Sequence, residues 1–549
     1  MSDLAISEQG GAPEAAALNC GEALVALLEA YGVELVFGIP GVHSLELYRG
    51  LAGSRIRHVL TRHEQGAAFM ADGYARLSGK PGVCILITGP GVTNAATAIG
   101  EAYADSVPLL VISAVNARNH LGKGWGHLHE ISDQRAVTAP LTAFSATALT
   151  AADLPDLMAK AFAVFESGRP RPVHIEIPID LLEAPAAGDL APRRPAGPPA
   201  PQTAAIGQAA ALLKSASRPA ILYGGGAKGC GPALQALAAR LDALLLPSIA
   251  AKGIVPEDSA HCPGFVLWSQ AGRDCLAEAD ALLAVGSEMA PTDSLVEALD
   301  IGGRLIRIDL DPAKLTDHYP AEVALLADAG AALDALLQSL GEGPPPRRDR
   351  SAAEIANALR ASVRAGLSGS ERVHERILTC LRDCLPDEAA VFADMTQIAY
   401  SGNLLYPARR DGGWLYPAGF GTLGYALPAA VGGALAAPER PVVALVGDHG
   451  LLYTGQELAT AVEQRLPLIV VLWNNNRLGQ IRDEMIEKGI PPLGVDLHSP
   501  DFCALAGAYG CRTSRPESLE AFAAELKGAL ARGDGPCFIE LQEDAAAAS

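Results

Sequence analysis

Runs of β-branched and other apolar residues recur along the chain, and each ends in a glycine-bearing turn before an Ala-rich or Leu-rich stretch. Such runs are typical of parallel strands that are buried on both faces. Residues 83–88 (VCILIT) and 108–115 (PLLVISAV) frame one such unit, and residues 441–447 (PVVALVG) and 467–474 (PLIVVLWN) frame another with the same layout. The order strand, glycine turn, helix, strand predicts right-handed βαβ units. The sequence therefore predicts an α/β fold whose two outer parts are copies of one layout.

Two proline-rich segments divide the 549 residues, which are too many for a single core. Residues 183–203 are rich in Pro and Ala, and the segment GEGPPPRRDRS begins at residue 341. Neither composition suits a helix or a central strand. We expect three domains, each a mostly parallel sheet flanked by helices. The expected parts are a flexible tail over 1–17, a first domain over 18–183, a Pro/Ala linker over 184–203, a central Rossmann-like domain over 204–340, a second linker over 341–365 and a third domain over 366–549.

The charge and composition argue against several classes of function. The formal net charge is −20, so no basic surface is available for nucleic acid, and anionic membranes are disfavoured too. No run of about eighteen apolar residues is present, and residues 1–17 lack the basic and apolar parts of a secretory signal. The ten cysteines are scattered without zinc-site spacing. We therefore expect a reduced, cytoplasmic protein that binds neither nucleic acid nor membranes.

A second pattern lies where two of the predicted strands end. The strand over 441–447 ends in Gly447 and is followed by Asp448 and Gly450, and the next strand leads to Asn475, 27 residues after Asp448. Neighbouring parallel strands bring such ends together, so both side chains would reach one ion. Mg²⁺ prefers oxygen ligands, and glycines beside a helix N-terminus let the backbone approach a phosphate. The pattern predicts a site for a cation-bridged diphosphate.

Glu64 has two interpretations on local grounds. It lies in RHEQGAAFMADGYAR, residues 62–76, whose apolar residues would pack on a sheet. The local pattern favours a solvated carboxylate in a first helical turn, where the helix dipole stabilises its charge. The alternative is a carboxyl group in an apolar place, whose raised pKa would let it share a proton with a ring nitrogen.

Together these motifs resemble those of thiamine diphosphate (ThDP) enzymes over nearly the whole chain. The family's metal signature matches GD-G followed by NN. The resemblance implies that Asp448, Asn475 and the backbone carbonyl of Arg477 bind Mg²⁺. The family's glutamate motif matches residues 62–76 almost throughout, which favours the second interpretation of Glu64. That residue would then be catalytic and would bond N1′ of the cofactor's aminopyrimidine. The two outer domains would share the ThDP-binding fold, the first for the pyrimidine and the third for the diphosphate and Mg²⁺.

Further family motifs indicate where the cofactor is held. GIPG over 38–41 and ITGPGVTN over 87–94 match cofactor-facing loops, and GFGTLGYALPAA over 419–430 matches the segment whose Leu423 would wedge the cofactor into a bent shape. His449 departs from the family pattern, which has a small residue there. The cofactor-binding residues implied by the resemblance are Pro40, Gly41, Glu64, Asn94, Gln397, Leu423, Gly447, Asp448, His449, Gly450, Asn475, Gly479, Gln480 and Ile481.

The resemblance also bears on partners and on a second cofactor. Family members build each site from the first domain of one subunit and the third domain of another, which implies a homodimer or homotetramer. The central domain resembles one that binds FAD or ADP in some relatives. Its glycine-rich turn, YGGGAKG over 223–229, lacks the strict dinucleotide spacing, so FAD is not expected.

The order of motifs is closest to acetolactate synthase, but two places differ from that enzyme. Leu128, His129 and Glu130 stand in place of its Phe-Gln-Glu, and Gln480 and Ile481 stand in place of its Met-Val. His129 would serve as a second catalytic residue that donates a proton or orients the substrate carboxylate. An exposed loop histidine with a local hydrogen bond is an equally open interpretation.

The segments over 38–51 and 120–130 are most similar to decarboxylases of 5-guanidino-2-oxopentanoate (2-ketoarginine), which yield 4-guanidinobutanal and CO₂ in arginine catabolism. We therefore expect non-oxidative decarboxylation of a 2-oxo acid, with an acetolactate synthase-type carboligase as the alternative. A cofactor-free paralogue is disfavoured because Glu64, Asp448 and Asn475 are all present. A guanidinium would pair with a planar carboxylate, and the candidates left open are Glu130, Glu288, Asp293, Asp483 and Glu484.

Overall fold

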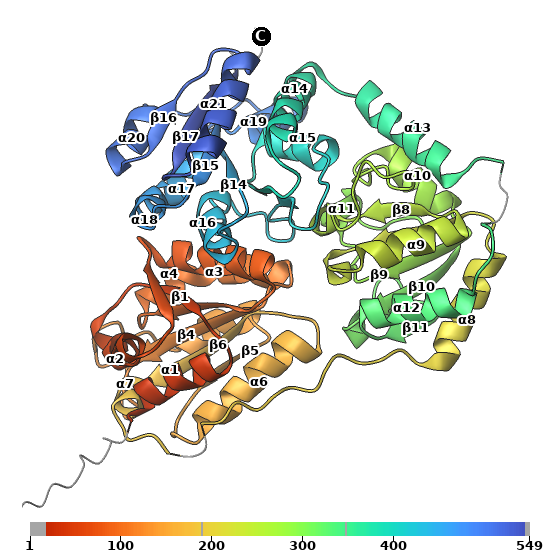
Figure 1. Ribbon diagram of the computed structural model, residues 1–549. Helices are drawn as coiled ribbons and strands as arrows, with labels where there is room; N and C mark the ends of the chain where they lie inside the picture. Colours follow the sequence, from red (N-terminus) through yellow and green to blue (C-terminus); the bar gives the residue numbers. More distant parts are fainter. Residues whose placement is uncertain (1–17, 188–189, 346–348, 544–549) are drawn as a thin grey trace, which may run out of the picture.

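The computed structural model describes residues 18–187, 190–345 and 349–543, so the tail predicted over 1–17 lies outside the described residues. Three sheets follow one another along the chain, and helices flank each of them (Figure 1). All strand pairs within these sheets are parallel. The predicted α/β fold with three parallel-sheet domains is confirmed.

The first sheet has six strands in the order β2-β1-β3-β4-β6-β5. Its strands are β1 (Leu35–Gly38), β2 (Arg57–Leu60), β3 (Gly82–Leu86), β4 (Leu109–Val115), β5 (Phe144–Thr147) and β6 (Val173–Pro178). Its helices are α1 (Cys20–Ala30), α2 (Leu45–Gly53), α3 (Glu64–Ser78), α4 (Pro90–Ala104), α5 (Gln134–Thr138), α6 (Asp153–Ser167) and α7 (Ile179–Leu182). The runs predicted over 83–88 and 108–115 are the central strands β3 and β4, which are fully buried.

The third sheet repeats the strand order of the first, β13-β12-β14-β15-β17-β16. Its strands are β12 (Ala390–Ala393), β13 (Trp414–Leu415), β14 (Val442–Gly447), β15 (Leu468–Asn474), β16 (Arg512–Ser514) and β17 (Cys537–Gln542). Its helices are α14 (Gly369–Cys384), α15 (Gln397–Leu405), α16 (Ala426–Ala436), α17 (Asp448–Thr454), α18 (Leu458–Glu463), α19 (Gly479–Glu487), α20 (Phe502–Tyr509) and α21 (Leu519–Arg532). The shared order confirms that the outer domains are copies of one layout.

The central sheet has five strands in the order β11-β10-β9-β7-β8. Its strands are β7 (Pro219–Tyr223), β8 (Leu244–Pro247), β9 (Ala281–Val285), β10 (Arg304–Asp309) and β11 (Val323–Leu326). Its helices are α8 (Thr203–Ser215), α9 (Gly231–Leu241), α10 (Gln270–Glu278), α11 (Pro291–Ser294) and α12 (Ala329–Leu340). In Figure 1 this domain lies beside the other two, which stack on each other.

The segment predicted as a linker over 341–365 contains a helix, α13 (Ala352–Ala365). A capping box begins it, in which Ser351 accepts a hydrogen bond from the backbone N–H of Glu354 and the Glu354 side chain returns one to the Ser351 N–H. The helix buries Ala352, Ala356 and Leu359 and packs against α10 and β8. Residues 341–345, the described part of the segment before this helix, are irregular, because Pro344 and Pro345 cannot donate the hydrogen bonds of a helix.

Two glycines let the outer domains of one chain approach each other closely. A β-carbon at Gly73 of α3 would lie 1.9 Å from the carbonyl oxygen of Ala429, and one at Gly432 of α16 would lie 1.8 Å from that of Met70. Helices α3 and α16 therefore pack almost backbone to backbone, and they lie side by side in Figure 1. One buried apolar cluster includes residues of both domains. This contact fixes the first domain against the third within a single chain.

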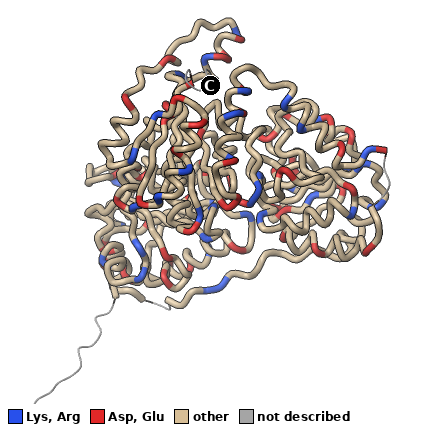
Figure 2. The backbone as a smooth tube through the Cα atoms, turned by 45° about the horizontal axis from the view of Figure 1, so that its top comes forward, with Lys and Arg blue, Asp and Glu red and all other residues tan. Residues whose placement is uncertain are grey.

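Acidic and basic residues are interspersed along the backbone (Figure 2). No helix in the described ranges is both long enough and apolar enough to cross a membrane.

Candidate active site

Asp448 lies at the carboxyl edge of the third sheet, directly after β14. Strand β14 pairs with β15 so that Gly447 lies opposite Trp473, which brings Asp448 beside the Asn475 region as predicted. The Asp448 side chain is buried, and its Oδ1 accepts a hydrogen bond of 2.7 Å from the backbone N–H of His449. Its Oδ2 is buried with no hydrogen-bond partner among the described residues. Burial raises the pKa of this carboxyl group, against a lowering by nearby backbone N–H groups.

An amide cluster lies beside that carboxylate. The side-chain N–H of Asn475 donates to Oε1 of Gln397 over 3.0 Å, and Oδ1 of Asn475 accepts a bond of 3.3 Å from the backbone N–H of Arg477. A β-carbon at Gly479 would lie 2.1 Å from Oε1 of Gln397, so a side chain there would push the Gln397 amide away from Asn475. The structure thus brings four of the predicted site residues together.

The buried carboxylate of Asp394 also belongs to this edge, although no sequence pattern singled it out. It accepts backbone N–H bonds from Met395 (2.8 Å) and Gly424 (3.0 Å), and burial raises its pKa to about 6. A β-carbon at Gly450 would lie 2.8 Å from its Oδ2. Asp394 therefore fixes the backbone immediately after Leu423 and the turn after Asp448. Its position directly after the apolar run of β12 was the one feature of the sequence that could have indicated a site residue.

Three predicted cofactor residues lie on this edge without forming part of the cluster. The ring of His449 packs edge-on against Tyr453, with centroids 5.4 Å apart. On α19, Gln480 donates to Glu484 over 3.1 Å, and Ile481 has an exposed fraction of 46%.

Glu64 begins α3 in the first domain. Its Oε2 accepts a hydrogen bond of 2.9 Å from the Asn94 amide, and the preceding His63 caps the helix by accepting from the N–H of Gln65. The carboxylate of Glu457, from the third domain, accepts backbone N–H bonds from Arg62 and His63. Contacts from both the first and the third domain therefore position Glu64.

The two predicted cofactor-facing loops meet at Glu64 through Ile87. A β-carbon at Gly41 would lie 2.5 Å from Cδ1 of Ile87, and one at Gly91 would lie 2.7 Å from Cγ2 of Ile87 and 3.7 Å from Cγ of Glu64. Pro40, which precedes Gly41, is exposed. The loops are packed so tightly that side chains at these glycines would collide with Ile87.

Comparison with known proteins gives the family. Models of the thiamine pyrophosphate enzyme family match along the chain: its N-terminal TPP binding domain matches residues 18–137, its central domain residues 206–336 and its C-terminal TPP binding domain residues 394–541. The chain belongs to this family. Each of its three domains matches the corresponding family domain, and the predicted resemblance to ThDP enzymes is confirmed.

Curated relatives cover almost the full length of this ThDP enzyme. It is 55% identical to the "Probable 2-ketoarginine decarboxylase" of Pseudomonas aeruginosa, over 96% of this chain and 94% of that protein. It is 31% identical to the acetolactate synthase isozyme 1 large subunit of Escherichia coli, over 95% of this chain and 94% of that protein. A probable acetolactate synthase large subunit of Methanocaldococcus jannaschii is 30% identical, over 96% and 92%.

The loop that carries His129 is held by its neighbour. The Glu130 carboxylate accepts backbone N–H bonds from Gly124 (2.8 Å), Gly126 (2.7 Å) and His127 (2.9 Å). These bonds lower the pKa of Glu130. His129 itself has a φ of 61°, in the left-handed region that few non-glycine residues adopt.

The five carboxylates considered as partners of a guanidinium lie in two different parts of the structure. Glu130 lies in the His129 loop, and Asp483 and Glu484 lie on α19, where they accept from Gln397 and Gln480. The other two, Glu288 and Asp293, line a cavity between the domains. The first three therefore lie beside predicted cofactor residues, and the last two do not.

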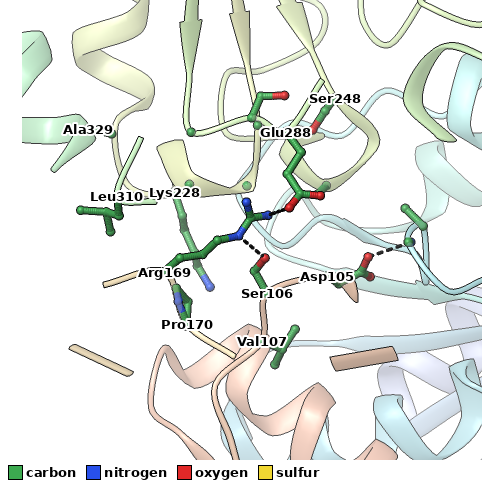
Figure 3. Close-up of a pocket in the computed structure, with 18 of the residues that line it drawn as sticks. Asp105, Ser106, Val107, Arg169, Pro170, Lys228, Ser248, Glu288, Leu310 and Ala329 are labelled. Carbon is green, nitrogen blue, oxygen red and sulfur yellow. Dashed lines mark hydrogen bonds and ion pairs between the residues drawn. The ribbon is translucent and has the colours of Figure 1, made fainter. Parts of the chain in front are cut away.

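That cavity, of about 440 Å³, lies where the three domains meet and includes the glycine-rich turn Gly224–Gly226. Arg169 reaches across it to Glu288 (2.6 Å) and also donates to Ser106 over 2.9 Å, as Figure 3 shows. A nucleotide filling the cavity would have to displace this ion pair. The absence of FAD stays a prediction.

Proposed function

We propose that this chain is a ThDP- and Mg²⁺-dependent decarboxylase of 5-guanidino-2-oxopentanoate, which it converts to 4-guanidinobutanal and CO₂ in arginine catabolism. The observation that carries the proposal is the 55% identity with the probable 2-ketoarginine decarboxylase over 96% of this chain. The acetolactate synthases share only 30–31% over a similar length. The ten cysteines of the described residues are all free thiols, which supports a reducing, cytoplasmic setting.

Mg²⁺ fits the residues at the end of β14. The unpartnered, buried Oδ2 of Asp448 is an oxygen that a cation would satisfy, and a buried carboxylate oxygen without a partner is otherwise costly. Asn475 and the backbone carbonyl of Arg477 would complete the protein ligands. Among the described residues no group of three or more His, Cys, Asp or Glu side chains could hold a metal. The ion would therefore depend on this mixed set of oxygens and on the diphosphate itself.

Glu64 is the proposed proton-exchange partner of the cofactor ring. When bound, ThDP supplies the carbanion that adds to the 2-oxo carbon and the electron sink for decarboxylation. In this chain Asn94 and the capping contacts of α3 hold the Glu64 carboxylate at the helix start, beside the loops that meet at Ile87. Leu423 would shape the cofactor from a segment that Asp394 fixes. The protein's part is thus to orient the cofactor and to move a proton at one ring nitrogen.

A complete site would need two chains. The carboxylate of Glu64 accepts from Asn94 of the first domain, and that of Asp448 accepts from His449 of the third, so each is held within its own domain. We therefore propose a homodimer or homotetramer in which Glu64 of one subunit faces Asp448 of another. The exposed apolar residues near both halves, Val42, Leu128, Leu452 and Ile481, support a covered surface there.

The alternative is a carboligase of the acetolactate synthase type, which the relatives at 30–31% identity favour. It would use the same Glu64 and Asp448. The replacement of the synthase's Gln by His129 and of its Met-Val by Gln480 and Ile481 weighs against it.

A product assay separates the two functions. The purified protein, with ThDP and Mg²⁺, would be offered 5-guanidino-2-oxopentanoate, pyruvate and branched 2-oxo acids, and the products identified by mass spectrometry. We expect 4-guanidinobutanal from the guanidino acid and little turnover of the others. Acetolactate from pyruvate, with no aldehyde from the guanidino acid, would replace the proposal by the carboligase.

A further inference from the structure

Two histidines from separate segments face each other in the first domain. His43 lies in the short helix η1 (Val42–Ser44), directly after the GIPG loop, and its ring packs edge-on against the ring of His129, with centroids 5.4 Å apart and planes at 86°. Nδ1 of His43 lies 2.9 Å from Oγ1 of Thr88, within hydrogen-bond distance. Because this contact uses Nδ1, the other ring nitrogen, Nε2, is the one that can exchange a proton.

The pair lies near Glu64, because three consecutive residues connect the histidines to the glycine that borders this carboxylate. Ile87 packs against Gly91, which borders the Glu64 side chain, Thr88 bonds His43, and Gly89 touches the backbone of His129. A β-carbon at Gly89 would lie 2.4 Å from the carbonyl oxygen of His129. The histidines therefore belong to the same edge of the sheet as the proposed proton-exchange carboxylate.

The backbone at His129 is strained and held in place. Its φ of 61° costs free energy for a residue with a β-carbon, and such residues persist where their surroundings fix them. Here the Asn116 amide donates to the carbonyl of Leu128 over 3.0 Å, and the Glu130 carboxylate takes three backbone N–H groups of the loop. This restraint points the His129 ring toward His43 rather than into solvent.

We propose that His43 and His129 act as a proton-transfer pair, in which His129 is the catalytic proton donor and His43 is the positioning residue that receives and returns the proton. The inference rests on the proposed function. In decarboxylation the C1–C2 bond breaks, CO₂ leaves, and the electron pair stays on C2. That carbon takes up one proton from His129, the aldehyde departs, and water returns a proton to the pair. One proton consumed per CO₂ released balances the reaction.

The electrostatics couple His43 to its neighbour. Burial, and then the charge that His129 carries when protonated, lower the pKa of His43. The elements packed against η1 add little: β4 carries no titratable side chain, and on α2 Glu46 pairs with Arg49 at 2.6 Å, while burial raises the pKa of Tyr48 and so keeps its hydroxyl, which bonds His58, uncharged. In the His129 loop the carboxylate of Glu130 is occupied by backbone N–H groups. His129 is therefore the charge that His43 senses.

The first test needs no turnover. Full-length protein with isotope-labelled histidines would be titrated by NMR, as wild type and as His129→Gln. Removal of the neighbouring charge should raise the pKa of His43, while the control His318→Asn, on the surface of the central domain, should not move it. An unchanged His43 titration in His129→Gln would overturn the coupling.

The second test follows the products separately. For whichever 2-oxo acid the wild type decarboxylates, His129→Gln should slow aldehyde release about a hundredfold or more, with a first-turnover burst of CO₂ preserved. His43→Asn, or His43→Gln if the first variant does not fold, should slow it about tenfold and shift its pH profile. If the variants at both His129 and His43 release the aldehyde at rates within twofold of wild type, the proposed proton-transfer role of the two histidines is wrong. If wild type decarboxylates no 2-oxo acid, the proposed function fails instead, and the NMR result still decides the coupling.

Discussion

Gly66 lies directly against the carboxylate of Glu457, so closely that a β-carbon at position 66 would stand 2.3 Å from Oε1 of Glu457. The two residues belong to the first and the third domain, and Gly66 lies two residues after Glu64 in α3. Oε1 also accepts backbone N–H bonds from Arg62 (3.1 Å) and His63 (3.0 Å). The third domain therefore positions the start of α3, where the proposed proton-exchange carboxylate lies.

Gly66→Ala should weaken both the fold and the cofactor site. The added methyl group would push away a carboxylate that two backbone N–H groups and the Thr460 hydroxyl hold, because Oε2 accepts from Thr460 over 2.8 Å. We expect a loss of about 1–3 kcal/mol in the free energy of unfolding, with weaker ThDP binding. Urea denaturation and a ThDP titration measure the two effects. The matched control is Gly53→Ala at the end of α2, where nothing lies within 4 Å of the new β-carbon. Equal behaviour of the two variants would contradict the packing argument.

Glu64→Gln should nearly abolish turnover while the fold is retained. Glutamine keeps the size of the side chain and can still bond Asn94, but it cannot exchange a proton with a ring nitrogen. The expected fall in kcat is about a hundredfold or more, measured by CO₂ release at saturating ThDP. Glu166→Gln, an exposed carboxylate on α6, is the control and should match wild type. Wild-type turnover by Glu64→Gln would remove this residue from the proposed mechanism.

Asp448→Asn should strongly reduce the stabilisation of the protein by Mg²⁺ and ThDP. A ligand at about a hundred times its Kd adds about 2.7 kcal/mol to the free energy of unfolding, so the wild type should melt at a higher temperature with both ligands and lose that gain on chelation. The variant lacks the charge on the buried oxygen and should gain far less. Asp334→Asn, on the exposed face of α12, should respond as wild type does. A full ligand-induced rise in the Asp448→Asn variant would place the ion elsewhere.

The sequence was sufficient to predict the position of a site residue where that residue directly follows a buried strand. Asp448 and Asn475 could be brought together because buried β-branched runs identify parallel strands, and parallel neighbours end at the same edge. The same reasoning predicted the duplicated layout, which the identical strand orders confirm.

Contacts across long sequence separations could not be predicted in this way. Glu457 lies 395 residues from Arg62, and no periodicity relates one to the other. His43 was missed because a histidine after a turn has no pattern of its own, and only the fold brings it to His129. Helix α13 was missed because the prolines before it dominated the composition of that segment, although Ser351 and Glu354 form a capping box.

Glu101 should make the stability of the protein depend on pH in a direction opposite to most carboxylates. It is fully buried in α4, where Oε2 accepts a bond of 2.8 Å from the Thr422 hydroxyl and Oε1 has no partner among the described residues. Burial first, and then the charge of Asp105, raise its pKa from 4.5 to about 8. The folded state therefore binds a proton that the unfolded state releases above pH 4.5, and the free energy of unfolding falls as pH rises through this window.

Glu101→Gln should remove that dependence. The stabilisation from the protonated carboxyl is fully present below pH 4.5 and is lost as pH rises to about 8, at a slope of at most about 1.4 kcal/mol per pH unit. Glutamine keeps the size and the acceptor for Thr422 without titrating. Chemical denaturation of both proteins between pH 5 and 9 should therefore show the wild type losing stability relative to the variant up to pH 8, with a constant difference above. Parallel curves across the whole range would mean that Glu101 titrates alike in the folded and unfolded chain, and that its contact with Thr422, next to Leu423, is made by a charged carboxylate.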